Sequence, residues 1–191
     1  MRIKKVINKD GIEIKGLGIL EPNIFEDSRG IFYESWNQRV FNNLIGENVV
    51  FVQDNKSISD QGVLRGLHYQ MKPNQQAKLV SCERGEIYDV ALDIRKDSPT
   101  FGSWAHSYLS SNNKKQFWIP NGFAHGFLTL SDKAIVSYKT TNYWHKDSEN
   151  SIIWNDDELN ISWPINELIV KTNRKDQLAS TLKQIPKSEL L

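Results

Sequence analysis

Short apolar runs, separated by turn residues, recur along most of the chain. The runs cover residues 31–36, 49–53, 63–70, 77–82, 87–93, 116–119, 126–130 and 134–138. They are rich in Val, Ile, Leu, Phe and Tyr, and their lengths are typical of β-strands. Arg84 and Gly85 lie between two of these runs and predict a hairpin turn.

Helical patterns are sparse by comparison. Residues 38–45 and 175–183 predict one short helix each. Many short strands with few helices indicate an all-β sandwich or barrel. Too little helix lies between the strands for a parallel α/β fold.

Size and composition fit one globular domain over residues 1–191, with 39% hydrophobic and 25% charged residues. The net charge of +1 predicts no nucleic-acid partner and no membrane-binding polybasic face. No stretch reaches the ~20 apolar residues of a membrane span. Cys82 is the single cysteine, which excludes an internal disulfide and a cysteine-rich zinc site. It is expected to be a buried, inert thiol in a cytoplasmic protein.

The run at residues 63–70 combines strand-forming residues with charged ones. Arg65 and His68 lie within it, and Lys78 opens the next run. Because side chains at even separation share one face of a sheet, we expect His68 and Lys78 to point into one cavity from adjacent strands. Histidine beside lysine and arginine can remove a proton next to a carbonyl and hold the resulting oxyanion. The alternative is three surface residues at the edge of a sheet.

A second motif is Pro-x-Gly-x-x-His at residues 120–125. It resembles the second signature of the cupin jelly rolls, in which a tight turn aims a histidine inward from the next strand. The alternative is a plain turn with a partly buried histidine. Metal-binding cupins also carry His-x-His and a glutamate, whereas no second histidine lies two positions from His68. The four histidines are scattered, so we expect no metal centre.

Together these motifs resemble one family, the dTDP-4-dehydrorhamnose 3,5-epimerases. Seven landmarks occur in the family's order, at residues 27–30, 32–35, 51–55, 64–68, 93–102, 120–126 and 154–156. The resemblance implies a cupin-like jelly-roll β-sandwich or barrel with a few short helices. It also implies a homodimer in which N-terminal strands cross to the partner. The implied substrate is a dTDP-linked 4-keto-6-deoxyhexose, inverted at the two carbons beside the ketone without a cofactor.

The resemblance assigns four catalytic positions. His68 is the base that removes the α-hydrogen, since histidine has a reference pKa of about 6.5. Asp176 holds its ring, as the third member of a triad does. Tyr138 is the acid on the opposite face of the sugar, where a nearby cation is expected to lower its pKa. Lys78 stabilises the enolate. Without the family, Asp176 reads as a solvated charge at a helix start and Tyr138 as a core aromatic.

The resemblance also assigns substrate contacts. Arginine and lysine suit the diphosphate, because guanidinium matches phosphate oxygens with two donors. The thymine is expected to stack on an aromatic ring at Tyr143 or Trp144, where the family usually has two tyrosines. His125 aligns with an active-site histidine that orients or polarises. The remaining contacts are Arg29, Arg65 and Lys175 for the diphosphate or its sugar, and Glu34, Gln53, Asn55 and Glu149 as polar contacts.

Four other activities remain open at this level. They are an epimerase acting on one carbon, a ketoisomerase, a non-catalytic sugar-nucleotide-binding module and a metal-dependent cupin oxygenase. A binding module would be expected to have lost His68, Lys78 or Tyr138, and all three are present. The sequence therefore favours the double epimerase, an isomerase.

Overall fold

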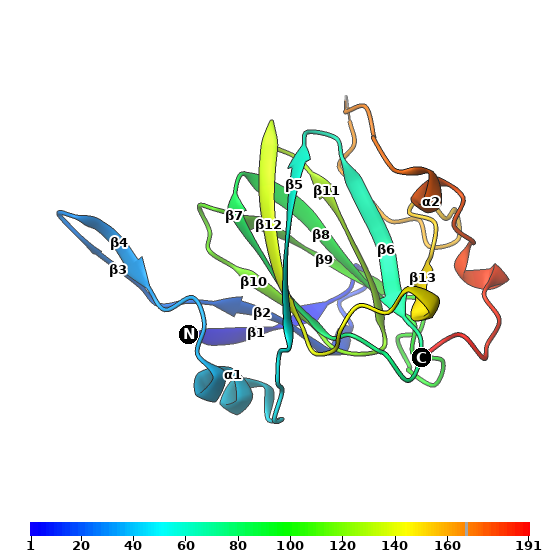
Figure 1. Cartoon of the computed structure of the whole chain (residues 1–191), viewed down its shortest axis with the longest axis horizontal. Coiled ribbons are helices and arrows are strands. Elements are labelled where there is room, and N and C mark those ends of the chain that lie inside the picture. Colours follow the sequence, from blue (N-terminus) through cyan, green and yellow to red (C-terminus); the bar gives the residue numbers. More distant parts are fainter. Residues whose placement is uncertain (167) are drawn as a thin grey trace.

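Two antiparallel β-sheets packed face to face form the body of the molecule, and a β-hairpin projects away from it (Figure 1). The computed structural model describes residues 1–166 and 168–191. The all-β sandwich with a few short helices that the sequence predicts is confirmed.

The larger sheet has six strands in the order β1-β2-β10-β7-β12-β5. Their bounds are β1 Arg2–Ile7, β2 Glu13–Glu21, β10 Gln116–Ile119, β7 Lys78–Arg84, β12 Lys133–Thr140 and β5 Gln53–Asp60. The smaller sheet has the order β13-β6-β11-β8-β9. Its bounds are β13 Glu149–Ser151, β6 Leu64–Gln70, β11 Phe123–Thr129, β8 Glu86–Asp93 and β9 Trp104–Ser110. The projecting hairpin consists of β3 Ile24–Asp27 and β4 Gly30–Tyr33.

Two apolar layers cover the smaller sheet. One lies between the sheets and includes Val80, Ile87 and Phe117. The other lies on the far face, where Leu92 and Leu128 pack with residues from the C-terminal part of the chain. Strands buried on both faces read as continuous apolar runs, which explains why β8 and β11 were predicted correctly.

The short helices begin and end where local chemistry dictates. Helix α1 (Gln38–Ile45) was predicted correctly: the side chain of Asn37 accepts from the Val40 N–H, and Gly46 closes the helix with φ 78°. The predicted helix over 175–183 is wrong beyond its first turn. Helix α2 spans only Arg174–Gln177, because Ser180 forms an isolated bridge with Ile152. Two 3-10 turns, η1 Lys146–Ser148 and η2 Leu182–Gln184, complete the set.

Three predicted strand features are wrong. Residues 49–52 are not a strand: the Val52 N–H donates to the Thr140 carbonyl at the end of β12, and Val49 and Phe51 pack against the cluster around α1. The run at 31–36 is a strand only to Tyr33. Arg84 and Gly85 do not close a hairpin, because β7 belongs to the six-stranded sheet and β8 to the five-stranded one. The turn there carries the chain from one sheet to the other.

Across residues 1–166 and 168–191, no helix combines the length and the apolar character needed to span a membrane.

Candidate active site

A pocket of about 370 Å³ receives side chains from both sheets. Most of the residues that line it are polar, and nine of them are positions named from the sequence. Those nine are Gln53, Asn55, Arg65, His68, Lys78, His125, Tyr138, Trp144 and Glu149. Its volume lies within the usual range of small-molecule sites.

Two histidines in this pocket are cross-strand neighbours. His68 on β6 lies directly opposite His125 on β11. Gly66 allows the two strands to approach, because a Cβ there would lie 2.5 Å from the Gly126 Cα and 2.7 Å from the His125 carbonyl oxygen. Its φ of +122° also excludes most other residues. The Arg-Gly-Leu-His segment therefore uses its glycine to bring two imidazoles together.

His68 is held by a buried carboxylate from α2. Its Nε2 lies 2.7 Å from Oδ1 of Asp176, so the contact implied by the family resemblance is present. The Gly66 N–H donates to Oδ2 at 3.2 Å. Burial alone would raise the pKa of Asp176, but these bonds and the His68 charge hold it below its usual value. With Nε2 donating to the carboxylate, Nδ1 of His68 is the ring atom free to act as a base.

His125 has a carboxylate partner that the sequence reasoning missed. Its Nε2 lies 2.9 Å and 3.1 Å from the two carboxylate oxygens of Asp89 on β8. Both side chains are buried, and burial raises the pKa of Asp89 and lowers that of His125. A signal was available: Asp89 interrupts the apolar run at residues 87–92, where a carboxylate requires a specific reason.

Lys78 enters the pocket from the opposite sheet. Its Nζ donates to the carbonyl oxygen of His68 at 3.3 Å. The prediction that both residues share one cavity is confirmed, but the prediction of adjacent strands is wrong: β7 and β6 belong to facing sheets. Burial lowers the pKa of Lys78 to about 8, although the charges of Asp89 and Glu149 oppose this shift.

Tyr138 also comes from the six-stranded sheet, on β12, where it lies opposite Asn55. Burial raises the pKa of its phenol; Arg65 opposes this shift and Glu149 adds to it. The expected cation, Arg65, does lower this pKa, but burial outweighs its effect. The phenol stays protonated at neutral pH. Because β6 and β12 belong to different sheets, His68 and Tyr138 enter the pocket from opposite sheets.

The other predicted contacts line the pocket or, like Lys175 and Tyr143, are not among its lining residues and bond to one of them. The Gln53 side chain donates to Asn55 at 2.9 Å and accepts from the backbone N–H of Trp144 at 3.1 Å. Lys175 is paired with Glu149 at 2.5 Å. Trp144 lines the pocket and is largely exposed, whereas Tyr143 is exposed and is not among the lining residues.

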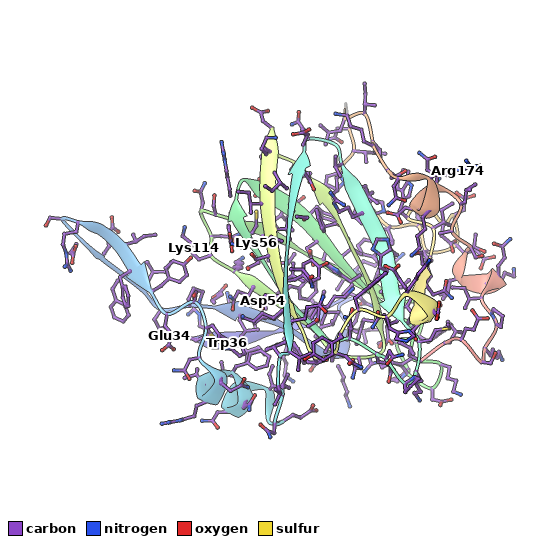
Figure 2. The ribbon with its side chains drawn as sticks, in the orientation of Figure 1. Glu34, Trp36, Asp54, Lys56, Lys114 and Arg174 are labelled. Atoms are coloured by element: carbon purple, nitrogen blue, oxygen red, sulfur yellow. The ribbon has the colours of Figure 1, made fainter. Side chains whose placement is uncertain are left out.

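Two predicted contacts lie away from the pocket within one chain. Arg29 is in the turn of the projecting hairpin, where it pairs with Asp27 and its side chain is 88% exposed. Glu34 follows β4 and accepts from Asn37 at 2.9 Å. Figure 2 labels Glu34 close to Trp36, where the hairpin joins the body.

A larger hollow of about 620 Å³ lies beside this region. It shares Asn55, Lys56 and Tyr138 with the first pocket, and Figure 2 labels Asp54, Lys56 and Lys114 among its lining residues. None of its described lining residues is a histidine, and Lys56 is paired with Glu83. Both histidines therefore line the smaller pocket. Among the described residues, no three His, Cys, Asp or Glu side chains are grouped so that they could hold a metal ion.

Comparison with known proteins gives consistent matches. The sequence model of the family described as dTDP-4-dehydrorhamnose 3,5-epimerase matches residues 11–184. The dTDP-4-dehydrorhamnose 3,5-epimerase of Salmonella typhimurium is 55% identical over 166 residues, covering 87% of this chain and 90% of that protein. The Escherichia coli enzyme of the same name is 49% identical over 94% of this chain and 96% of its own length.

A solved structure agrees with these matches. The dTDP-6-deoxy-D-glucose-3,5-epimerase of Legionella pneumophila, in complex with dTDP-4-keto-L-rhamnose, superposes with a TM-score of 0.91. It is 48% identical, and the alignment covers 99% of this chain and 97% of that one.

Proposed function

The chain belongs to the dTDP-4-dehydrorhamnose 3,5-epimerase family, and we propose that His68, Lys78 and Tyr138 perform that chemistry in the smaller pocket. The activity is that of an isomerase, which inverts carbons 3 and 5 of dTDP-4-dehydro-6-deoxyglucose to give dTDP-4-dehydro-L-rhamnose.

The reaction at each carbon is an exchange of one proton for another. Nδ1 of His68 takes the hydrogen next to the ketone, and the C–H electrons form the enolate. The Lys78 ammonium stabilises the charge on the enolate oxygen. The Tyr138 phenol then delivers a proton to the opposite face, and the ketone re-forms. Solvent returns a proton to Tyr138 and removes one from His68, so no cofactor is required.

One observation carries this proposal: the base and the acid belong to opposite sheets that face one pocket. A sugar ring between the sheets has one face toward His68 and the other toward Tyr138, which inversion requires. The nucleotide end would lie toward the mouth, with Arg65 and Lys175 near the diphosphate and Trp144 against the base. The single buried cysteine, Cys82, supports a cytoplasmic setting for this enzyme.

The product distinguishes this function from its alternatives. The protein is incubated in heavy water with dTDP-4-keto-6-deoxyglucose, and the product is identified by NMR. We expect inversion and deuterium at both carbons. Inversion at one carbon would make the protein a single-centre epimerase, and a ketone moved along the ring would make it a ketoisomerase.

The proposal includes a homodimer completed by the projecting hairpin. Its apolar side chains are exposed, including Phe25 at 62% and Phe32 at 72%. Exposed apolar area of this kind marks an interaction surface. In a second copy, the hairpin would bring Arg29 and Glu34 to a pocket that they do not reach in their own chain.

Mixing two inactive variants tests this exchange. In a mixed dimer of Arg29→Ala and His68→Asn, one pocket receives an intact His68 and an intact Arg29 only if Arg29 is supplied by the partner. Random re-pairing should then restore about a quarter of wild-type activity. If light scattering shows that the mixed protein is dimeric but no activity is recovered, Arg29 acts in the site of its own chain.

A further inference from the structure

Asp89 is a buried carboxylate that the proposed reaction does not use. It is fully buried in the middle of β8, between Tyr88 and Val90. Within the described residues, its side-chain hydrogen bonds go only to Nε2 of His125. Burying an ionised carboxylate is strongly unfavourable unless a compensating charge or bond network is present. Such a group requires a reason beyond packing.

Asp93, four residues along the same strand, shows what a structural carboxylate looks like here. Arg95 pairs with both of its oxygens, and Ser98 and Thr100 each donate at 2.7 Å. Burial alone would raise its pKa, but these donors hold it below the usual value. This network ties down the loop after β8. Asp89 has no comparable network, and its pKa is raised.

The negative charge of Asp89 interacts favourably with the Lys78 ammonium. Burial lowers the pKa of Lys78 to about 8, and the charge of Asp89 is the larger of the two that oppose this. Titratable or charged groups line the pocket from several strands. Besides Lys78 they are Lys56 on β5, Arg65, His68 and Tyr69 on β6, His125 on β11, Tyr138 on β12 and Glu149 on β13. Asp89 on β8 is not among the lining residues and is connected to the pocket through its bonds to His125.

We propose that Asp89 is a positioning residue of the reaction: its carboxylate fixes the His125 ring through Nε2 and balances the Lys78 ammonium inside the pocket. The inference rests on the proposed function, because it concerns the enolate stabilised there. With Asp89 ionised, Lys78 keeps its proton and His125 keeps one orientation as the substrate excludes water. With a neutral residue at position 89, Lys78 loses its proton at lower pH and the enolate loses its counter-charge.

The test is the pH dependence of kcat in Asp89→Asn, with Asp93→Asn as the matched control. Both changes neutralise a buried carboxylate of β8. For Asp89→Asn we expect kcat to fall more than about tenfold near pH 8, with KM within about twofold. The alkaline limb of kcat should move to lower pH by about one unit. Its thermal midpoint should fall less than that of the control, because Lys78 can lose its proton once the counter-charge is removed.

The control should behave in the opposite way. Asp93→Asn is expected to lower the thermal midpoint, because it disrupts the Arg95 network, while the alkaline limb stays in place. An Asp89→Asn enzyme with wild-type kcat and an unmoved alkaline limb would overturn this inference alone. A wild-type protein without epimerase activity would overturn the proposed function and this inference with it.

A second variant tests the charge itself, independently of how an amide packs. Asp89→Ala leaves space for a small molecule, and we expect formate to raise its kcat while formamide of nearly the same shape does not. Equal rescue by both, or no rescue by formate, would overturn the assignment of a charge-dependent role.

Discussion

Two histidine–aspartate pairs lie side by side on neighbouring strands, and their surroundings differ. His68 is 29% exposed, and its partner Asp176 also accepts a backbone N–H. His125 is 8% exposed, and Asp89 bonds to that ring alone among the described residues. The pKa of Asp176 is lowered, whereas that of Asp89 is raised. The same two residue types therefore form an open, charge-stabilised pair and a closed, poorly solvated one.

The two pairs are therefore suited to different roles in the pocket. An open pair with a stable carboxylate can pass a proton to and from a substrate, because the imidazolium that forms is stabilised and still reached by water. A closed pair exchanges protons less readily, but its charge acts strongly on a neighbouring ammonium. We therefore assign proton removal to His68. We assign to the His125–Asp89 pair the role of stabilising the Lys78 ammonium.

The largest expected effect separates the two histidines. His68→Asn should lower kcat by about a thousandfold or more, because general-base catalysis is lost. His125→Asn should lower it by only about ten- to a hundredfold, because the base remains. Steady-state rates with circular dichroism as the folding check measure both. A larger loss in His125→Asn than in His68→Asn would make His125 the base and contradict the assigned roles.

Tyr138→Phe removes the acid that belongs to neither pair. His68 and Lys78 remain, so the enolate still forms, but reprotonation returns mainly to the starting face. In heavy water we expect deuterium uptake with little doubly inverted product, read by NMR. If Tyr138 serves only in core packing, the change is nearly silent, since Phe keeps the ring. An unchanged yield of doubly inverted product would remove Tyr138 from the mechanism.

Asp176→Asn tests whether the His68–Asp176 pair needs its carboxylate. The amide loses the charge that stabilises the imidazolium and the bond that fixes its tautomer, so kcat should fall more than about tenfold. Asp156→Asn is a suitable control, because Asp156 is also buried and accepts backbone N–H groups, whereas its side chain bonds to none of the residues that line the pocket. Equal losses in the two variants would reduce Asp176 to a structural role.

The smallest expected effect is that of a chelator. Because each proton transfer has a protein group, extensive treatment with EDTA should leave kcat unchanged within error. Loss of activity that a divalent ion restores would place a metal in the mechanism and make both pairs candidate ligands.

Apolar patterns predicted strands that are buried on both faces, such as β8 and β11, and they missed β5, which borders the pocket, together with β1, β2 and β9. Strand β5 reads QDNKSISD, and its inward positions include Gln53 and Asn55. An inward face that is polar for substrate binding gives no hydrophobic alternation. Conversely, Val49 and Phe51 pack against the cluster around α1 while Val50 and Val52 are exposed, so the apolar residues 49–52 read falsely as a strand.

The site was predictable only in part, for a similar reason. His68 and Lys78 lie close in sequence, so their shared cavity could be inferred. No spacing rule pairs His68 with Asp176, and that contact came only from the family resemblance. Asp89 was missed although a carboxylate in an apolar run is visible in the sequence, because its partner His125 lies on a strand far along the chain. Arg29 and Glu34 depend on a second copy in our proposal, which a single sequence does not reveal.

Deuterium uptake from heavy water into the sugar carbons beside the ketone tests the division of work most directly, because it reports proton removal without requiring inversion. His68→Asn and His125→Asn are each mixed with the dTDP-4-keto sugar at enzyme excess, and exchange is followed by NMR. We expect no enzyme-dependent uptake in His68→Asn and slower but complete uptake in His125→Asn. Uptake at near wild-type rate in His68→Asn would show that His68 is not the base.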